Sequence, residues 1–147
     1  MTHYLDTSAF VAWFDPHNPH CRPVFAWRER ERDAVTPAYN RILQLESRHY
    51  LGRLTHSHAG LAWHAFRAFE GRRLYEWVKL DFSGLVELCE DLSQSHKPKL
   101  QCGYWDLCHI VAARKFDLPF VTCDVRQSEA AKMIGVKTTL IRSPQKA

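Results

Sequence analysis

Residues 103–135 read GYWDLCHIVAARKFDLPFVTCDVRQSEAAKMIG, and this stretch decides the fold. Its apolar pattern predicts a helix over 103–115, a short strand over 119–123 and a second helix over 125–134 that Gly135 ends. A short strand between two helices is typical of α/β proteins with a parallel sheet. Asp124 follows the strand directly, at the edge of the sheet where ligands collect in such folds.

The start of the chain repeats this design. Residues 2–5 predict a strand, Asp6 follows it, and Thr7 or Ser8 is expected to cap the next helix. An Asp at the start of a helix is most often only a cap. Because the carboxyl ends of parallel strands meet at one edge of a sheet, however, we expect Asp6 and Asp124 to face one crevice.

Helices and strands alternate between these two segments. Thr36 and Pro37 are interpreted as the N-cap and first turn of a long helix, which should form a hairpin with the helix after it. The pattern predicts a short, mainly parallel central sheet flanked by helices, in a single domain over 1–142 with a loose tail at 143–147. The other expected elements are helices at 22–32, 38–54, 61–71 and 81–95, strands at 34–36, 74–80 and 136–141, and loops at 16–19 and 96–101.

The composition indicates a soluble globular protein. Hydrophobic residues make up 46% of the 147 residues and charged residues 24%, and the net charge of +4 is compatible with a polyanionic partner without requiring one. The five cysteines form no C-x-x-C pair, so we expect reduced thiols and a cytoplasmic protein. No signal-like segment opens the chain and no apolar run is long enough for a membrane span, so no membrane partner is expected.

Two further acids lie within apolar stretches. Asp106 is expected inside the helix over 103–115, where a carboxylate must be paired, protonated, metal-bound or turned toward a cleft. His109, three residues later, could neutralise it. Glu46 lies in the apolar part of the long helix, although Arg48, Arg53 or solvent could satisfy it there.

The segments YLDTSAF, a helical Glu after TP, WDLCHIVAA and FVTCD occur in this order and resemble a PIN domain, the metal-dependent nuclease fold of VapC-type toxins. The resemblance spans nearly the whole chain and implies an α/β/α sandwich. Glu70 and Glu76 are weaker alternatives to Glu46, because the segment between Pro37 and Glu46 is longer than the family pattern. The positions that match the family's acids are Asp6, Glu46, Asp106 and Asp124, and those that match the small hydroxyl residues beside them are Thr7, Ser8 and Thr122.

Four carboxylates in one pocket repel each other unless a cation neutralises them, and oxygen ligands suit Mg²⁺ or Mn²⁺. Such an ion lowers the pKa of a bound water and offsets charge on a phosphodiester. We therefore expect hydrolysis of RNA, with Asp6, Asp106 and Asp124 as metal ligands and Glu46 as a ligand or water-orienting group. The neighbouring hydroxyl groups would orient these carboxylates.

The expected partners follow from the charge and from the resemblance. Arg41, Arg48 and Arg53 are available for contacts with RNA phosphates. The resemblance implies a homodimer and, for the toxin branch, a cognate antitoxin. A PIN-like module that binds RNA or protein without cutting is the main alternative. A phosphatase with an Asp-x-Asp motif is disfavoured, because Ser8 stands where the second Asp would be.

Histidines suggest a different metal. His17, His20 and Cys21 lie close together, and His56 and His58 share one later segment. Zinc needs converging nitrogen or sulfur ligands, and these positions do not form two regular ligand pairs. The spacing therefore does not favour a structural zinc site.

Overall fold

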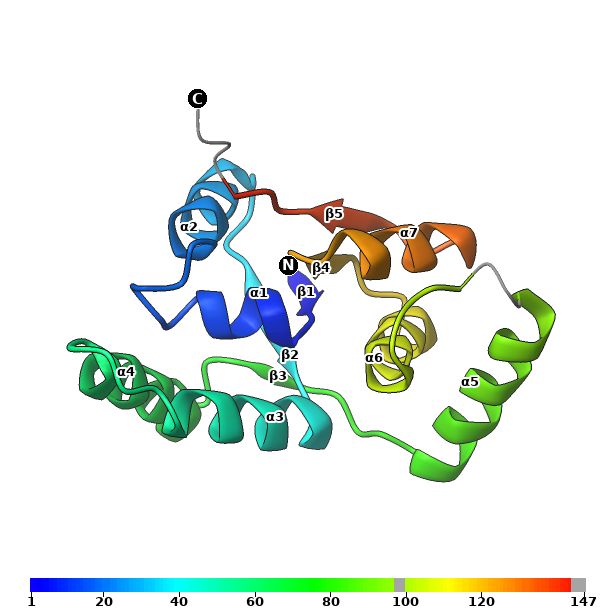
Figure 1. Cartoon of the computed structure of the whole chain (residues 1–147), viewed down its shortest axis with the longest axis horizontal. Coiled ribbons are helices and arrows are strands. Elements are labelled where there is room, and N and C mark those ends of the chain that lie inside the picture. The colour runs from blue at the N-terminus through cyan, green and yellow to red at the C-terminus, as the bar shows by residue number, and fades with distance from the viewer. Residues whose placement is uncertain (97–99, 144–147) are drawn as a thin grey trace.

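The computed structural model describes residues 1–96 and 100–143 (Figure 1). The expected tail at 143–147 lies outside the described residues apart from Ser143, and residues 97–99 of the expected loop at 96–101 also lie outside them. The elements are β1 (Thr2–Leu5), α1 (Thr7–Ala12), α2 (Cys21–Arg30), β2 (Thr36–Tyr39), α3 (Arg41–Gly52), α4 (Ala59–Gly71), β3 (Glu76–Trp77), α5 (Phe82–His96), α6 (Tyr104–Lys115), β4 (Phe120–Thr122), α7 (Val125–Met133) and β5 (Thr138–Leu140).

The described strands form one five-stranded sheet in the order β3-β2-β1-β4-β5, and every pair in it is parallel. Helices flank this sheet in an α/β/α arrangement, which confirms the predicted fold class. The central strand β1 pairs with β4 in a register that sets Leu5 opposite Val121. Asp6 and Asp124 therefore follow adjacent strands at the same edge of the sheet, as expected.

The first helix is capped by Asp6, whose carboxylate accepts a hydrogen bond from the backbone N–H of Ala9 at 3.0 Å. The expectation that Thr7 or Ser8 caps this helix is wrong. Both residues belong to the first turn of α1, and their hydroxyl groups donate to carboxylates instead.

The second strand is longer than expected and the next helix starts later. Thr36 and Pro37 belong to β2, and Asn40 is the N-cap of α3, so the predicted Thr36 cap is wrong. Pro37 pairs with His3 of β1, and β3 joins β2 only from the next residue onward. A proline, which has no N–H to donate, is therefore tolerated in this strand.

The remaining helices largely match the predicted pattern. The helices α3 and α4 contact each other, as expected for a hairpin. The helix α7 ends at Met133, and Gly135 follows with a φ of 80°, a conformation that glycine adopts without strain. No helix among the described residues is both long and apolar enough to cross a membrane.

An aromatic cluster links α1 to the sheet and to α4. Phe10 is fully buried, and its ring centroid lies 5.2 Å from Phe14, 5.4 Å from Tyr39, 6.3 Å from Phe66 and 5.5 Å from Phe69. Burying side chains of this size is the main stabilising contribution to such a core. The cluster holds α1, and with it Asp6, against β2.

Candidate active site

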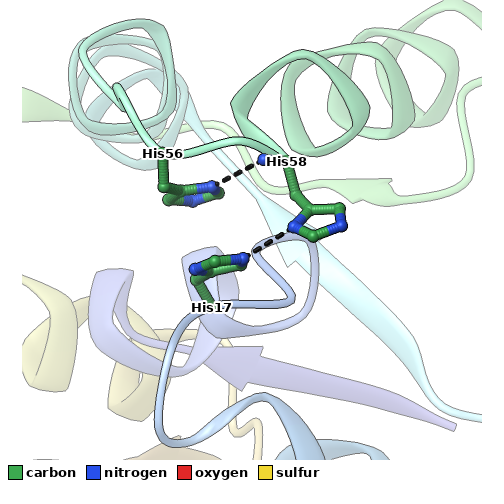
Figure 2. A group of neighbouring side chains, drawn as sticks. All are labelled: His17, His56 and His58. Atoms are coloured by element: carbon green, nitrogen blue, oxygen red, sulfur yellow. Dashed lines mark hydrogen bonds between the residues drawn. The ribbon is translucent and has the colours of Figure 1, made fainter.

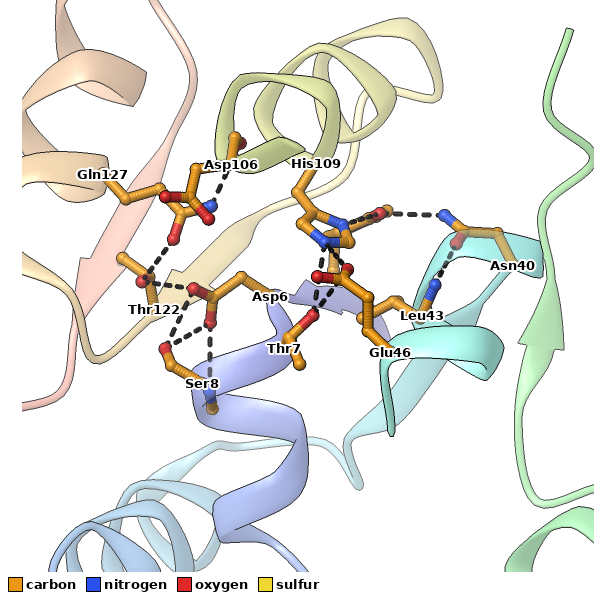
Figure 3. A network of polar contacts seen from close by, with 12 residues as sticks. Asp6, Thr7, Ser8, Asn40, Leu43, Glu46, Asp106, His109, Thr122 and Gln127 are labelled. Carbon is orange, nitrogen blue, oxygen red and sulfur yellow. Dashed lines mark hydrogen bonds and ion pairs between the residues drawn. The ribbon is translucent and has the colours of Figure 1, made fainter. Parts of the chain in front are cut away.

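Asp6 is the most buried acid of the predicted site, with 3% of its surface exposed. Ser8 Oγ donates to its two carboxylate oxygens at 2.8 and 2.9 Å, and Thr122 Oγ1 donates at 2.8 Å (Figure 3). Burial raises the pKa of Asp6 to about 6, although the hydrogen bonds from Ala9, Ser8 and Thr122 act in the opposite direction. The carboxylate is thus fixed in position but costly to keep charged.

We expect Asp6→Asn to alter how the stability of the metal-free protein depends on pH. Because the pKa of Asp6 is about 6 in the folded chain against an ordinary 3.8, the folded state binds this proton more tightly. The stability that this proton contributes is fully present below the ordinary pKa of 3.8, and it is lost as the pH rises through the folded-state pKa of about 6. The loss is about 3 kcal/mol at most. Asn has no such proton.

Urea unfolding in the presence of a chelator measures this effect. Wild type should lose stability relative to Asp6→Asn when the pH is raised from about 5 to about 7.5, because only wild type then carries a buried charge. An equal difference between the two proteins at both pH values would contradict the assigned pKa.

Thr122 connects the acids that follow β1 and β4. Its Oγ1 donates to Asp6, accepts from the backbone N–H of Asp124 at 3.0 Å and lies 3.3 Å from Gln127 Oε1. Gln127 Nε2 in turn donates to the backbone oxygen of Asp106 at 3.1 Å. Gln127 is fully buried and was missed by the sequence analysis, where its position in the first turn after Asp124 was the available signal.

Asp106 lies in the first turn of α6, so the expectation of a mid-helix carboxylate is wrong. The helix begins at Tyr104 because Gly103 has an extended backbone and serves as N-cap. The Asp106 carboxylate accepts a hydrogen bond from the backbone N–H of Gly103 and so helps to cap the start of α6. Burial raises its pKa, and the nearby charge of Asp124 adds to this shift.

Cys102 gives a second sign that these two acids are close to each other. Burial raises the pKa of its thiol to about 11, and the charges of Asp106 and Asp124 both contribute. Asp124 itself is exposed, and its carboxylate caps α7 by accepting the backbone N–H of Arg126 at 2.9 Å. Asp106 and Asp124 therefore share one acidic region beside a neutral thiol.

His109 pairs with Glu46 and not with Asp106, the partner that its spacing in the sequence allowed. Its Nε2 lies 2.5 Å from Glu46 Oε1, and its Nδ1 lies 2.7 Å from the Tyr4 hydroxyl. Asn40 Nδ2 donates to the Tyr4 oxygen at 2.8 Å, which leaves the Tyr4 proton for Nδ1 of His109. This order of donors places the ring proton of neutral His109 on Nε2, directed at Glu46.

Glu46 lies beside Thr7 and His109 in this network, and 37% of its side chain is exposed (Figure 3). Thr7 Oγ1 also donates to its Oε1, at 2.9 Å. Burial acts to raise the pKa of Glu46, but the contacts with His109 and the Thr7 hydroxyl outweigh it, so the pKa lies below its ordinary value. Glu46 is therefore a carboxylate near neutral pH.

Glu70 and Glu76, the two alternatives to Glu46, lie outside this network. Glu70 forms ion pairs with Arg48 at 3.0 Å and with Arg67 at 2.8 Å, and Glu76 accepts a hydrogen bond from Thr2. Neither acid reaches the network, so both alternatives to Glu46 are wrong. The positive charge of Arg48 is offset by Glu70 rather than by Glu46.

The two other arginines predicted to contact phosphate are exposed on or beside α3. Arg41 donates to Gln44 at 2.6 Å, and Arg53 Nη1 lies 3.0 Å from His49 Nε2. Neither contact neutralises the guanidinium charge with a carboxylate. Both side chains thus remain available to a polyanion, whereas Arg48 is already paired.

The acidic residues have the chemistry of a divalent-metal site. In the described part of the chain, the ion pairs leave Asp6, Asp106 and Asp124 without a lysine or arginine partner. A hard cation bound by carboxylate oxygens would offset the burial that raises the pKa of Asp6 and Asp106. Within the described residues only His17, His56 and His58 bring three ligand atoms within 4.8 Å of one another, so the oxygens of the three acids are spaced more widely than that.

Comparisons with known proteins agree with this architecture. FitAcB from Neisseria gonorrhoeae superposes with a TM-score of 0.66 at 17% identity, over 94% of this chain and 96% of that chain. FitAB bound to an IR36 DNA fragment gives a TM-score of 0.66 at 16% identity, over 95% and 94% of the two chains. No curated protein matches significantly in sequence. The family model of the PIN domain matches residues 3–133, and the chain therefore belongs to the PIN domain family.

Proposed function

We propose that this protein is a metal-dependent endoribonuclease that hydrolyses RNA phosphodiester bonds. PIN domains are generally nucleases and typically use divalent metal ions. The observation that supports the proposal best is that Thr122 links Asp6 and Asp124 at one edge of a parallel sheet, with the charge of Asp106 close to that of Asp124.

Asp6, Asp106 and Asp124 would hold Mg²⁺ or Mn²⁺ through carboxylate oxygens. When bound, the ion supplies positive charge to the scissile phosphate and acidifies a water molecule. Ser8 and Thr122 fix the Asp6 carboxylate so that its oxygens need not reorganise.

Glu46 is the group best suited to accept a proton from the attacking water. Its pKa lies below the ordinary value, so it is ionised near neutral pH. Thr7 and His109 both contact Oε1 and thereby fix the orientation of the carboxylate. The buried chain from Asn40 through Tyr4 keeps the His109 ring in the orientation that supports this contact.

The proposed substrate is RNA, held by the exposed guanidinium groups of Arg41 and Arg53. The proposed partners are a second copy of the chain and a cognate antitoxin, as for VapC-type toxins. An antitoxin arginine that reached the acids would form charge-assisted hydrogen bonds with them and block the site. The five free thiols are consistent with the proposed cytoplasmic location.

Removal of the divalent metal should abolish RNA cleavage. Purified, folded protein free of inhibitor is incubated with structured cellular RNA and Mg²⁺ or Mn²⁺, beside a sample treated with EDTA and a sample to which excess metal is restored. We expect fragments only where free metal is present, because three clustered acids without a cation would repel a phosphate.

The same assay distinguishes the two candidate activities. Cleavage at the same rate in EDTA would overturn the metal-dependent proposal. RNA binding without cleavage under all of these conditions would favour the alternative, a PIN-like module that binds RNA without cutting.

A further inference from the structure

We propose that His17, His56 and His58 form a zinc site that is separate from the acidic region. His17 lies in the segment after α1, whereas His56 and His58 lie between α3 and α4 (Figure 2). One ligand atom from each ring lies within 4.8 Å of the other two. The fold thus brings His17 to two histidines that lie about 40 residues later in the sequence.

The closest pair is His17 Nε2 and His58 Nδ1, at 2.6 Å. Two nitrogens bound to one tetrahedral zinc at about 2.0–2.1 Å are separated by about 3.3 Å. The two rings must therefore move apart by less than about 1 Å to admit the ion. Both side chains are exposed, so this adjustment disturbs no packed core.

His56 is the third member of the cluster. Its ring is stacked on that of His17, with centroids 4.1 Å apart and planes at 4°. Because a nitrogen lone pair lies in the plane of its ring, one of the two rings must rotate to coordinate an ion shared with the other. His17 is the ring that can rotate, since it is exposed whereas His56 is half-buried.

Asp15 prepares His56 for metal binding. This acid is 3% exposed, and its Oδ1 lies 2.8 Å from His56 Nε2 and accepts the backbone N–H of His17 at 3.0 Å. A carboxylate that accepts the Nε2 proton leaves the lone pair on Nδ1, which is the usual outer-shell arrangement of metal-bound histidine. The ion would displace the backbone N–H of His58, which now donates to that Nδ1 at 3.0 Å.

The ligand chemistry selects zinc over the ions suited to the acidic region. Imidazole nitrogen suits zinc and neighbouring transition metals, whereas Mg²⁺ and Mn²⁺ prefer carboxylate and water oxygens. Three histidines leave a fourth tetrahedral position for water. Excess Mg²⁺ should therefore not compete with zinc for this cluster.

The position of the cluster indicates what bound zinc would do. The helices α1 and α3 contact each other, and the segments that follow them carry the three histidines. Asp6 and Thr7 lie at the opposite end of α1. Zinc would tie the C-terminal ends of the two helices together, so its main effect should be on stability.

The test uses the full chain without an affinity tag, stripped of metal. Zinc is titrated against a chromophoric chelator in excess Mg²⁺, and thermal unfolding is followed with and without zinc. Wild type should bind one zinc per chain and unfold at a higher temperature with zinc. His58→Ala and His17→Ala should each bind at least about 100-fold more weakly and lose the shift in Tm. His64→Ala, which removes an exposed histidine of α4 outside the cluster, is the matched control and should behave as wild type.

Two results would overturn the proposal. Equal zinc affinity in wild type, His17→Ala and His58→Ala would show that the ion binds elsewhere, and its loss in Asp106→Asn would assign it to the acidic region. A wild-type Tm that does not respond to zinc, with a lower Tm in His58→Ala, would show that the rings act only through hydrogen bonds between the two segments.

Discussion

We expect the Asp106→Asn variant to cleave RNA more than about 100-fold more slowly than wild type while remaining folded. Asn has the same shape, and its Oδ1 can still accept the Gly103 N–H that Asp106 accepts at the start of α6. What it loses is the negative charge that a divalent ion requires beside Asp124. Initial cleavage rates at saturating Mg²⁺ measure the effect, and RNA affinity is measured separately without turnover.

Asp117→Asn is the matched control for this change. Asp117 is exposed in the turn after α6 and has a φ of 51°, a conformation that Asn tolerates well. The Asp117→Asn change removes one negative charge from the same region of the sequence and leaves Asp6, Asp106 and Asp124 unchanged. Wild-type cleavage by Asp106→Asn would remove this carboxylate from the proposed mechanism, and loss of RNA binding together with cleavage would indicate a role in binding instead.

The largest expected loss of stability comes from Phe10→Ala. Phe10 is fully buried among four other aromatic rings contributed by neighbouring elements. Removing it leaves a cavity that these rings cannot fill by small movements, so the free energy of unfolding should fall by about 3–5 kcal/mol. Urea unfolding of both proteins measures the difference.

Phe25→Ala makes the same chemical change on the surface. Phe25 lies on α2 and is 56% exposed, so its loss should change the free energy of unfolding by no more than about 0.5 kcal/mol. Equal losses in the two variants would mean that the aromatic cluster does not anchor α1. At temperatures where Phe10→Ala is folded, we expect its rate of RNA cleavage to stay close to that of wild type.

Local sequence rules predicted those parts of the fold that depend on neighbours in the chain. The strand before Asp6 and the helix that ends just before Gly135 were both predicted correctly, because strand alternation, helix capping and positive φ are properties of a few consecutive residues. The order of strands and helices likewise predicted a parallel sheet. The edge of the sheet at which Asp6 and Asp124 lie follows directly from that order.

The same rules failed where a distant strand or helix changed the outcome. Thr36 and Pro37 have the composition of a helix start, but pairing with β1 makes them a strand. Asp106 and His109 are spaced for a helical ion pair, yet His109 instead contacts Glu46, which is 63 residues away. An isolated helix would favour the local pair, and the packing of α3 beside α1 supplies a nearer carboxylate.

The sequence by itself determined the fold class, the acids that follow the strands and the residue types that suit a divalent ion. Only the tertiary structure decided which side chains share hydrogen bonds, as Thr122 does with Asp6 and Asp124, and that His17 meets His58 across 41 residues. The physical reason is the distance along the chain over which each kind of interaction acts. Backbone preferences act over a few residues, whereas contacts between segments depend on how buried helices and strands pack, and that packing depends on the whole core.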